Sequence, residues 1–196
     1  MAESGAESGV PSEVLIGVTG HRVLAELPRV LAGVEAALDR IEAANPGRAL
    51  VVVSCLAEGA DRLVAEAVLR RPGARLVAVL PMPQGELVAD FVTEESRAEF
   101  EGLLGRAGEV VELPSRATRD EAYAAANEWM LGGVDVLVAV WDGGDAQGPG
   151  GTGEVVARAR VRQQPLAWIH ARNRQPGTRE ALGPGVETGH VTFDNL

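Results

Sequence analysis

Short, continuously apolar runs recur along the chain, and amphipathic patterns fill the intervals between them. The apolar runs predict strands at residues 14–18, 50–53, 76–80, 109–113, 136–141 and 166–169. Apolar positions spaced three or four residues apart predict helices at about 24–41, 60–71, 94–104, 119–131 and 152–162. Residues 84–92 fit neither pattern and are interpreted as a loop over the site, and residues 191–193 as an edge strand.

The strands alternate with helices, and they are apolar throughout rather than at every second position. This combination is typical of a parallel sheet that is covered by helices on both faces. We therefore predict a Rossmann-like α/β fold, doubly wound, with a mostly parallel sheet of about six strands. Residues 13–170 are expected to form this domain, residues 1–12 a disordered leader, and residues 171–196 a polar extension.

In such sheets, ligands bind beyond the carboxyl ends of the strands, at the point where the strand order reverses. Small, polar and flexible residues follow four of the predicted strands, and they are the candidate ligand-binding residues. These are Thr19, Gly20, His21, Arg22, Ser54, Ala57, Glu58, Gly59, Asp61, Pro81, Asp142, Gly150, Gly151, Thr152 and Gly153.

The loop after the fifth predicted strand has the strongest pattern. Residues 143–153 contain six glycines, and a helical pattern begins at Thr152. Unpaired N–H groups at the start of a helix carry a partial positive charge, and glycines allow the backbone to approach a phosphate closely. The loop therefore indicates a nucleotide or sugar-phosphate site. The alternative is a glycine-rich surface turn, because a single Gly-Gly-Thr-Gly is a weak signal.

Five polar side chains beside these turns are candidates for ligand contact or catalysis. Arg22 is a candidate phosphate clamp. His21 is a candidate for base stacking or proton transfer, or else a helix-capping or packing residue. Asp61 and Asp142 are positioned either to accept ribose hydroxyls or to cap their turns. Glu154 is the one candidate catalytic residue: its carboxylate either compensates the helix dipole or reaches the anomeric carbon of a sugar.

The composition of the chain excludes several classes of function. The net charge is −10, and all eighteen strong cations are arginine. An acidic protein lacks the basic surface that nucleic-acid binding requires, so no nucleic-acid partner is expected. The absence of lysine also excludes Schiff-base chemistry and a Walker-type phosphate lysine. A small anionic ligand held by N–H groups and one or two arginines stays compatible.

Targeting and metal signals are sparse. The start of the chain has no basic-plus-apolar signal, and no apolar run nears the ~18 residues of a membrane span. A lone cysteine, Cys55, excludes an internal disulfide and favours the cytoplasm; it is interpreted as a buried inert thiol. His170 and His190 lack companions at metal-ligand spacing, and we expect neither a metal nor a cofactor.

Two stretches resemble known nucleotide-related proteins. The sequence SCLAEGAD, at 54–61, is similar to the turn Ser-Gly-x-Ala-x-Gly-Ile-Asp of DNA-processing protein A, with matches at Ser54, Ala57, Gly59 and Asp61. The sequence VDVLVAVWDG followed by GPGGTGE resembles the Pro-Gly-Gly-x-Gly-Thr-x-x-Glu loop of Lonely Guy-type phosphoribohydrolases. Together with VTGHR, these motifs resemble uncharacterised bacterial members of the SLOG superfamily.

The resemblance implies nucleotide or nucleotide-derivative binding and a homodimer, with the helix carrying Trp129 and Met130 as its interface. Two departures bear on catalysis. Thr152 lies two residues before Glu154 rather than three, and the Arg-Lys pair of the Lonely Guy-type enzymes is missing. The leading hypothesis is thus a nucleotide-sensing domain. The alternative is an enzyme that cleaves the N-glycosidic bond of nucleoside monophosphates, in the manner of a phosphoribohydrolase or deoxyribosyltransferase.

Overall fold

The structure is a computed structural model, and it describes residues 13–145, 148–172 and 187–196. The leader predicted at residues 1–12 lies outside the described residues, as does the part of the predicted extension at residues 173–186. Residues 187–196 of that extension are described.

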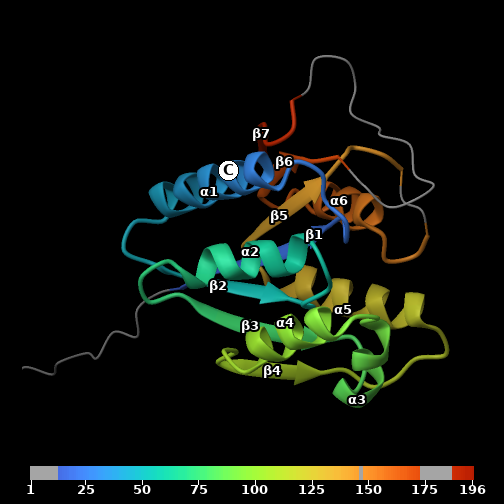
Figure 1. Cartoon of the computed structure of the whole chain (residues 1–196). Helices are drawn as coiled ribbons and strands as arrows, with labels where there is room; N and C mark the ends of the chain where they lie inside the picture. Colours follow the sequence, from blue (N-terminus) through green and yellow to red (C-terminus); the bar gives the residue numbers. More distant parts are fainter. Residues whose placement is uncertain (1–12, 146–147, 173–186) are drawn as a thin grey trace, which may run out of the picture.

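A single seven-stranded sheet in the order β4-β3-β2-β1-β5-β6-β7 organises the chain (Figure 1). The strands are β1 (Glu13–Gly20), β2 (Ala49–Ser54), β3 (Arg75–Leu80), β4 (Glu109–Glu112), β5 (Val136–Trp141), β6 (Leu166–His170) and β7 (Val191–Asp194). The first six are mutually parallel, and β7 pairs antiparallel with β6. The predicted fold class is confirmed; β7 is the edge strand expected near residues 191–193.

Helices cover both faces of this sheet. They are α1 (Leu27–Ala44), α2 (Ala60–Leu69), α3 (Gln84–Leu87), the 3-10 turn η1 (Val88–Asp90), α4 (Glu94–Leu104), α5 (Arg119–Gly133) and α6 (Thr152–Val161). The buried apolar side chains of α1, α2 and α4 share one core with one face of the sheet. Those of α6 and most of those of α5 share a second core with the other face, whereas Ala122 of α5 belongs to the first core. Two separate cores explain why the central strands are apolar at every position.

The segment at residues 84–92 corrects one expectation. It is not a loop but forms α3 and η1, because Leu87 and Phe91 bury their side chains in the same core as Phe100 of α4. The rings of Phe91 and Phe100 lie 4.9 Å apart. The segment is fixed by this packing, and none of its residues lines the cavity described below.

The reversal in strand order falls between β1 and β5. These strands pair directly, with Thr19 opposite Ala139 and Gly20 opposite Val140. The chain leaves β1 for α1 on one face and leaves β5 for α6 on the other face. The two connections therefore diverge and open a crevice at the carboxyl ends of the strands, as the doubly wound arrangement requires.

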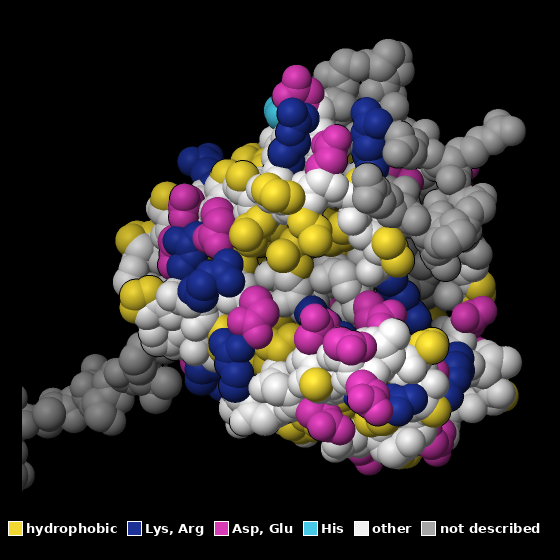
Figure 2. All heavy atoms as spheres, viewed as in Figure 1, with side chains coloured by type: hydrophobic (Ala, Val, Ile, Leu, Met, Phe, Trp, Pro, Cys, Tyr) yellow, Lys and Arg dark blue, Asp and Glu magenta, His cyan; other side chains and the backbone are white. Residues whose placement is uncertain are grey.

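The surface carries mixed charge. Arg71, two residues after the end of α2, forms ion pairs with Glu35, Asp39 and Glu42 of α1. Figure 2 shows such arginine and acidic side chains side by side on one face of the molecule. Among the described helices, none is long and apolar enough to cross a membrane. Arginines neutralised in this way leave no continuous basic surface on the face shown.

Candidate ligand-binding site

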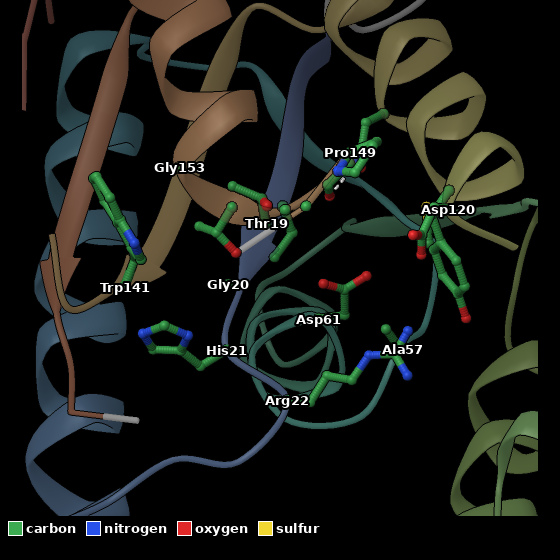
Figure 3. A pocket seen from close by; sticks show the side chains of 18 of the residues that line it. Thr19, Gly20, His21, Arg22, Ala57, Asp61, Asp120, Trp141, Pro149 and Gly153 are labelled. Carbon is green, nitrogen blue, oxygen red and sulfur yellow. Dashed lines mark hydrogen bonds between the residues drawn. The ribbon is translucent and has the colours of Figure 1, made fainter. Parts of the chain in front are cut away.

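A cavity of about 470 Å³ opens at the reversal between β1 and β5 (Figure 3). The ends of β1, β2 and β5 and one side of α5 form its wall. Ten predicted residues line it: Thr19, Gly20, His21, Arg22, Ala57, Asp61, Gly150, Gly151, Thr152 and Gly153. The lining also includes Val18, Cys55, Asp120, Tyr123, Asn127, Trp141, Asp145, Gly148 and Pro149. Three turns that are far apart in sequence thus meet at one place.

The N–H and the carbonyl of Gly150 are both held by hydrogen bonds to side chains. Its N–H donates to Glu154 Oε2 at 2.8 Å, and its carbonyl accepts from Asn127 Nδ2 at 2.9 Å. The φ angle of Gly150 is +76°, and a Cβ at this position would lie 3.0 Å from the backbone nitrogen of Ala124. Only glycine meets both conditions without strain, so the loop holds a defined shape against α5.

The glycine loop presents N–H groups at the start of α6. The N–H of Gly151 donates to Gly148 and that of Glu154 to Gly151, whereas those of Thr152 and Gly153 have no partner among the described residues. Both of these residues line the cavity. Unpaired N–H groups at a helix start carry the positive end of the helix dipole. The cavity therefore has an anion-attracting wall made of main chain.

Glu154 lies outside the cavity lining, so the structure does not place the predicted catalytic carboxylate next to a ligand. One oxygen accepts the Gly150 N–H, and the other pairs with Arg158 at 2.6 Å. These partners, the Gly150 N–H first, hold the pKa of Glu154 below its ordinary value. An ionised carboxylate with these two partners shapes the loop, in agreement with the structural interpretation of this residue rather than the catalytic one.

The turn after β2 satisfies its own N–H groups. Ser54 Oγ donates to Asp61 Oδ2 at 3.0 Å and accepts the N–H of Leu56 at the same distance. The backbone N–H groups of Cys55 and Ala57 also favour the ionised form of the Asp61 carboxylate. Ser54 itself is buried beneath the lining. This turn therefore offers a carboxylate to the cavity rather than a second cradle for phosphate.

Asp61 is a buried carboxyl group in the lining, and its pKa is raised. It is only 7 % exposed, and Figure 3 shows its carboxylate pointing into the open space. Burial raises its pKa to about 6, although the Ser54 hydroxyl, the two N–H groups and the charge of Arg22 favour ionisation. Burial prevails because it removes water from a charge that has no full counter-ion.

Glu58, Gly59 and Pro81 are near the site but do not line it. Glu58 accepts a hydrogen bond from Ser96 on α4 and so is directed toward that helix. Gly59 has a φ of +78° and packs against the carbonyl groups of His21 and Arg22, so its missing side chain allows two turns to meet. Pro81 follows β3, which is two strands away from β1.

The buried side chain of Arg62 supports the turn after β2. Its Nε donates to the carbonyl of Leu56 at 3.1 Å, and its Nη1 reaches Ser96 Oγ and Glu99 Oε2 of α4, both at 3.0 Å. Leu56 needs such support because its φ of +55° is unusual for a residue with a branched side chain. Arg62 thus links the cavity wall to α4.

Arg22 is an exposed cation at the cavity. Its guanidinium lies 5.0 Å from the centre of the Tyr123 ring, and it forms no ion pair with a described residue. By contrast, Arg70, Arg71 and Arg75 are each paired with a carboxylate. Arg22 is therefore positioned by an aromatic face and keeps its charge available for a ligand.

His21 and Asp142 form a pair at the ends of β1 and β5. The Asp142 N–H donates to His21 Nε2 at 3.1 Å, and the Asp142 carboxylate lies 3.2 Å from the same nitrogen. Burial lowers the pKa of His21, and the nearby Asp142 charge opposes this shift. Asp142 does not line the cavity; its carboxylate accepts the N–H of Gly144 at 2.9 Å and so caps the turn.

The lining residues that were not predicted as ligand contacts include Asp120, Tyr123, Asn127, Trp141 and Asp145. Tyr123 and Asn127 lie one helical turn apart on α5 and belong to a stripe of side chains along one side of the helix. That stripe does continue into the core at Met130, which is fully buried. The sequence signal that could have assigned Tyr123 and Asn127 to the lining is that both are polar side chains in this stripe.

The remaining polar candidates do not form a metal site. Burial, and next the nearby Asp61 charge, raise the pKa of the Cys55 thiol, which fits the predicted inert cysteine. His170 and His190 lie with ring centres 5.6 Å apart, and burial lowers the pKa of His170. Within the described ranges, no group of three or more His, Cys, Asp or Glu is placed to hold a metal ion.

Comparisons with known proteins identify no family for this chain. No protein-family model matches the chain, and a comparison with curated proteins finds no significant match. Among solved structures, the chain is similar to the Moco carrier protein of Chlamydomonas rheinhardtii. The two are 19 % identical, the match covers 79 % of this chain and 74 % of that one, and the TM-score is 0.42. The doubly wound fold is therefore established by the strand order of the chain itself.

Proposed function

We propose that the cavity binds a nucleotide or a closely related sugar phosphate, and that the domain acts as a sensor of this ligand. The observation that carries the proposal is the glycine loop: Gly150 is held by Asn127 and Glu154, and the N–H groups of Thr152 and Gly153 have no partner in the described part of the chain. A loop fixed in this way binds an anion without first losing conformational freedom.

The other parts of the ligand are matched by the remaining wall. The phosphate lies on the N–H groups of Thr152 and Gly153, with Arg22 as its counter-ion. Asp61 lies beside the sugar phosphate, and its protonation state decides whether it accepts from or donates to a ligand oxygen. The rings of Tyr123 and Trp141 offer flat apolar surface to a base. The volume of about 470 Å³ is in the range of small-molecule sites.

A binding role is favoured over glycosidic bond cleavage. The cleavage mechanism needs a carboxylate at the anomeric carbon, and Glu154 is instead bonded to Gly150 and Arg158. A DNA-handling role is disfavoured by the mixed surface charge, since DNA binding depends on many phosphate contacts. Membership of the SLOG superfamily stays a proposal that rests on the two sequence motifs.

The experiment is calorimetric titration of the protein with AMP, followed by chromatography of the same mixture for free adenine. Binding with no adenine supports the sensor. Adenine release that is lost in Glu154→Gln supports the glycosidase instead. Gly151→Val, which adds bulk at the N-cap of α6, should abolish binding while circular dichroism shows an unchanged fold. Unchanged affinity in this variant overturns the placement of the phosphate.

A homodimer is proposed from resemblance alone. Of the two predicted interface residues on α5, Met130 is fully buried, whereas Trp129 is 43 % exposed. Only Trp129 is therefore available to a partner. Sedimentation of the wild type and Trp129→Glu tests this proposal: a dimer that persists in the variant removes α5 as the interface.

A further inference from the structure

The cavity contains more negative than positive charge. Its described lining includes three aspartates, Asp61, Asp120 and Asp145, against a single arginine, Arg22. His21 does not restore the balance, because burial lowers its pKa and favours the neutral imidazole. A phosphate that carries two negative charges would therefore meet net repulsion from the side chains, in spite of the N–H groups of the glycine loop.

The three aspartates differ in their access to water. Asp120 and Asp145 are exposed, so solvent screens their charges. Asp61 is 7 % exposed and directed into the cavity. Its charge is the one that a bound phosphate would meet without screening, and protonation of this carboxyl is the least costly way to remove the repulsion.

We propose that the site takes up one proton when it binds its phosphate-bearing ligand, and that Asp61 carries this proton. This inference rests on the proposed function. The neutral carboxyl keeps Oδ2 as the acceptor for Ser54 and gains an O–H that donates to a ligand oxygen. The ionised carboxylate can only accept, so it repels a phosphate oxygen at the same place.

The groups around Asp61 strengthen this coupling. Arg22, from the connection after β1, favours the ionised form in the free protein, as do Ser54 and the N–H groups of Cys55 and Ala57. A bound phosphate engages Arg22 and adds a negative charge, so both changes favour the neutral acid. The other groups facing the cavity, namely Cys55, His21, Asp120, Tyr123 and Asp145, supply no second cation near neutral pH.

The test compares AMP affinity at about pH 5.5 and about pH 7.5 in the wild type and in Asp61→Asn, which cannot ionise. AMP itself titrates in this range, and the variant reports that contribution separately. Because Asp61 titrates with a pKa of about 6, the fraction of neutral acid falls about twentyfold between the two pH values. We expect the ratio of wild-type to variant affinity for AMP to be about twentyfold lower at about pH 7.5 than at about pH 5.5.

The outcomes separate the two proposals. A ratio that does not change with pH overturns proton uptake and leaves the nucleotide site intact. Absence of AMP binding at both pH values overturns the nucleotide site and this inference with it. If Asp61→Asn does not fold, wild-type calorimetry with inorganic sulfate, a dianion over this range, replaces it. Two buffers of different ionisation enthalpy then report the protons bound: about one per site supports the proposal, and none overturns it.

Discussion

The carboxylate of Glu154 accepts the N–H of Gly150 at 2.8 Å and thereby folds the first turn of α6 back onto the loop that precedes it. Asn127 holds the carbonyl of the same glycine from α5. The loop is thus shaped by two helices before any ligand arrives. A preorganised loop lowers the entropic cost of binding, which makes this pair of contacts central to the proposed site.

Substitution of Glu154 separates a shaping role from a chemical one. Glu154→Gln keeps an oxygen that accepts the Gly150 N–H, so we expect AMP affinity within about threefold of the wild type. Glu154→Ala leaves that N–H without its partner and should weaken AMP binding about tenfold, with a loss of about 1 kcal/mol in the free energy of unfolding. Calorimetry and urea denaturation measure both effects. Equal losses of affinity in the two variants would contradict the shaping role.

Gly150 tests the shape of the loop directly. Alanine at this position must adopt a φ of +76° and place its Cβ 3.0 Å from the backbone of Ala124. We expect Gly150→Ala to destabilise the fold by about 1–3 kcal/mol and to weaken AMP binding. The control is Gly102→Ala on α4, where nothing lies within 4 Å of the added carbon; this variant should be neutral or slightly stabilising. Tolerance of both changes would show that the loop is not fixed.

Arg22 is expected to affect binding and not stability. It forms no ion pair with a described residue, and a charged hydrogen bond to phosphate contributes about 1.5–3 kcal/mol. Arg22→Gln should therefore weaken AMP binding about ten- to a hundredfold and leave the thermal midpoint nearly unchanged. Arg29→Gln removes an exposed arginine of α1 that does not line the cavity and serves as the control. Similar affinity in both variants would remove Arg22 from the site.

The stability of the fold should report the burial of Asp61. Its pKa rises from 3.8 to about 6 on folding, so between these pH values the folded protein holds a proton that the unfolded chain has lost. This residue therefore lowers stability as pH rises through that window, by at most about 3 kcal/mol. Asp61→Asn lacks this effect.

The free energy of unfolding of Asp61→Asn, minus that of the wild type, should accordingly increase from about pH 4 to about pH 7. Urea denaturation at several pH values measures this difference. The substitution also changes hydrogen bonds of Asp61, but their contribution is the same at every pH and does not affect the pH dependence of the difference. A difference that is flat with pH would mean that Asp61 ionises as readily in the fold as in the unfolded chain.

The fold and the location of the cavity followed from sequence because continuous apolar strands and turn residues are local signals. Tyr123 and Asn127 could not be assigned to the lining, since helical periodicity defines a buried stripe but not which part of it meets a loop. Gly59 was predicted as a ligand contact, but the group that approaches it closely is the backbone at His21 and Arg22. Glu154 was ambiguous because spacing does not reveal the direction of a side chain.

Backbone NMR of the wild type shows whether the N–H groups of Thr152 and Gly153, at the start of α6, bind the phosphate. On titration with AMP, the amide protons of Thr152 and Gly153 should move strongly downfield, as expected for N–H groups that begin to donate to a charged acceptor. The amide of Gly73, in the turn before β3 and remote from the cavity, should not move. Binding of AMP with no change at Thr152 and Gly153 would show that the phosphate does not lie at the start of α6.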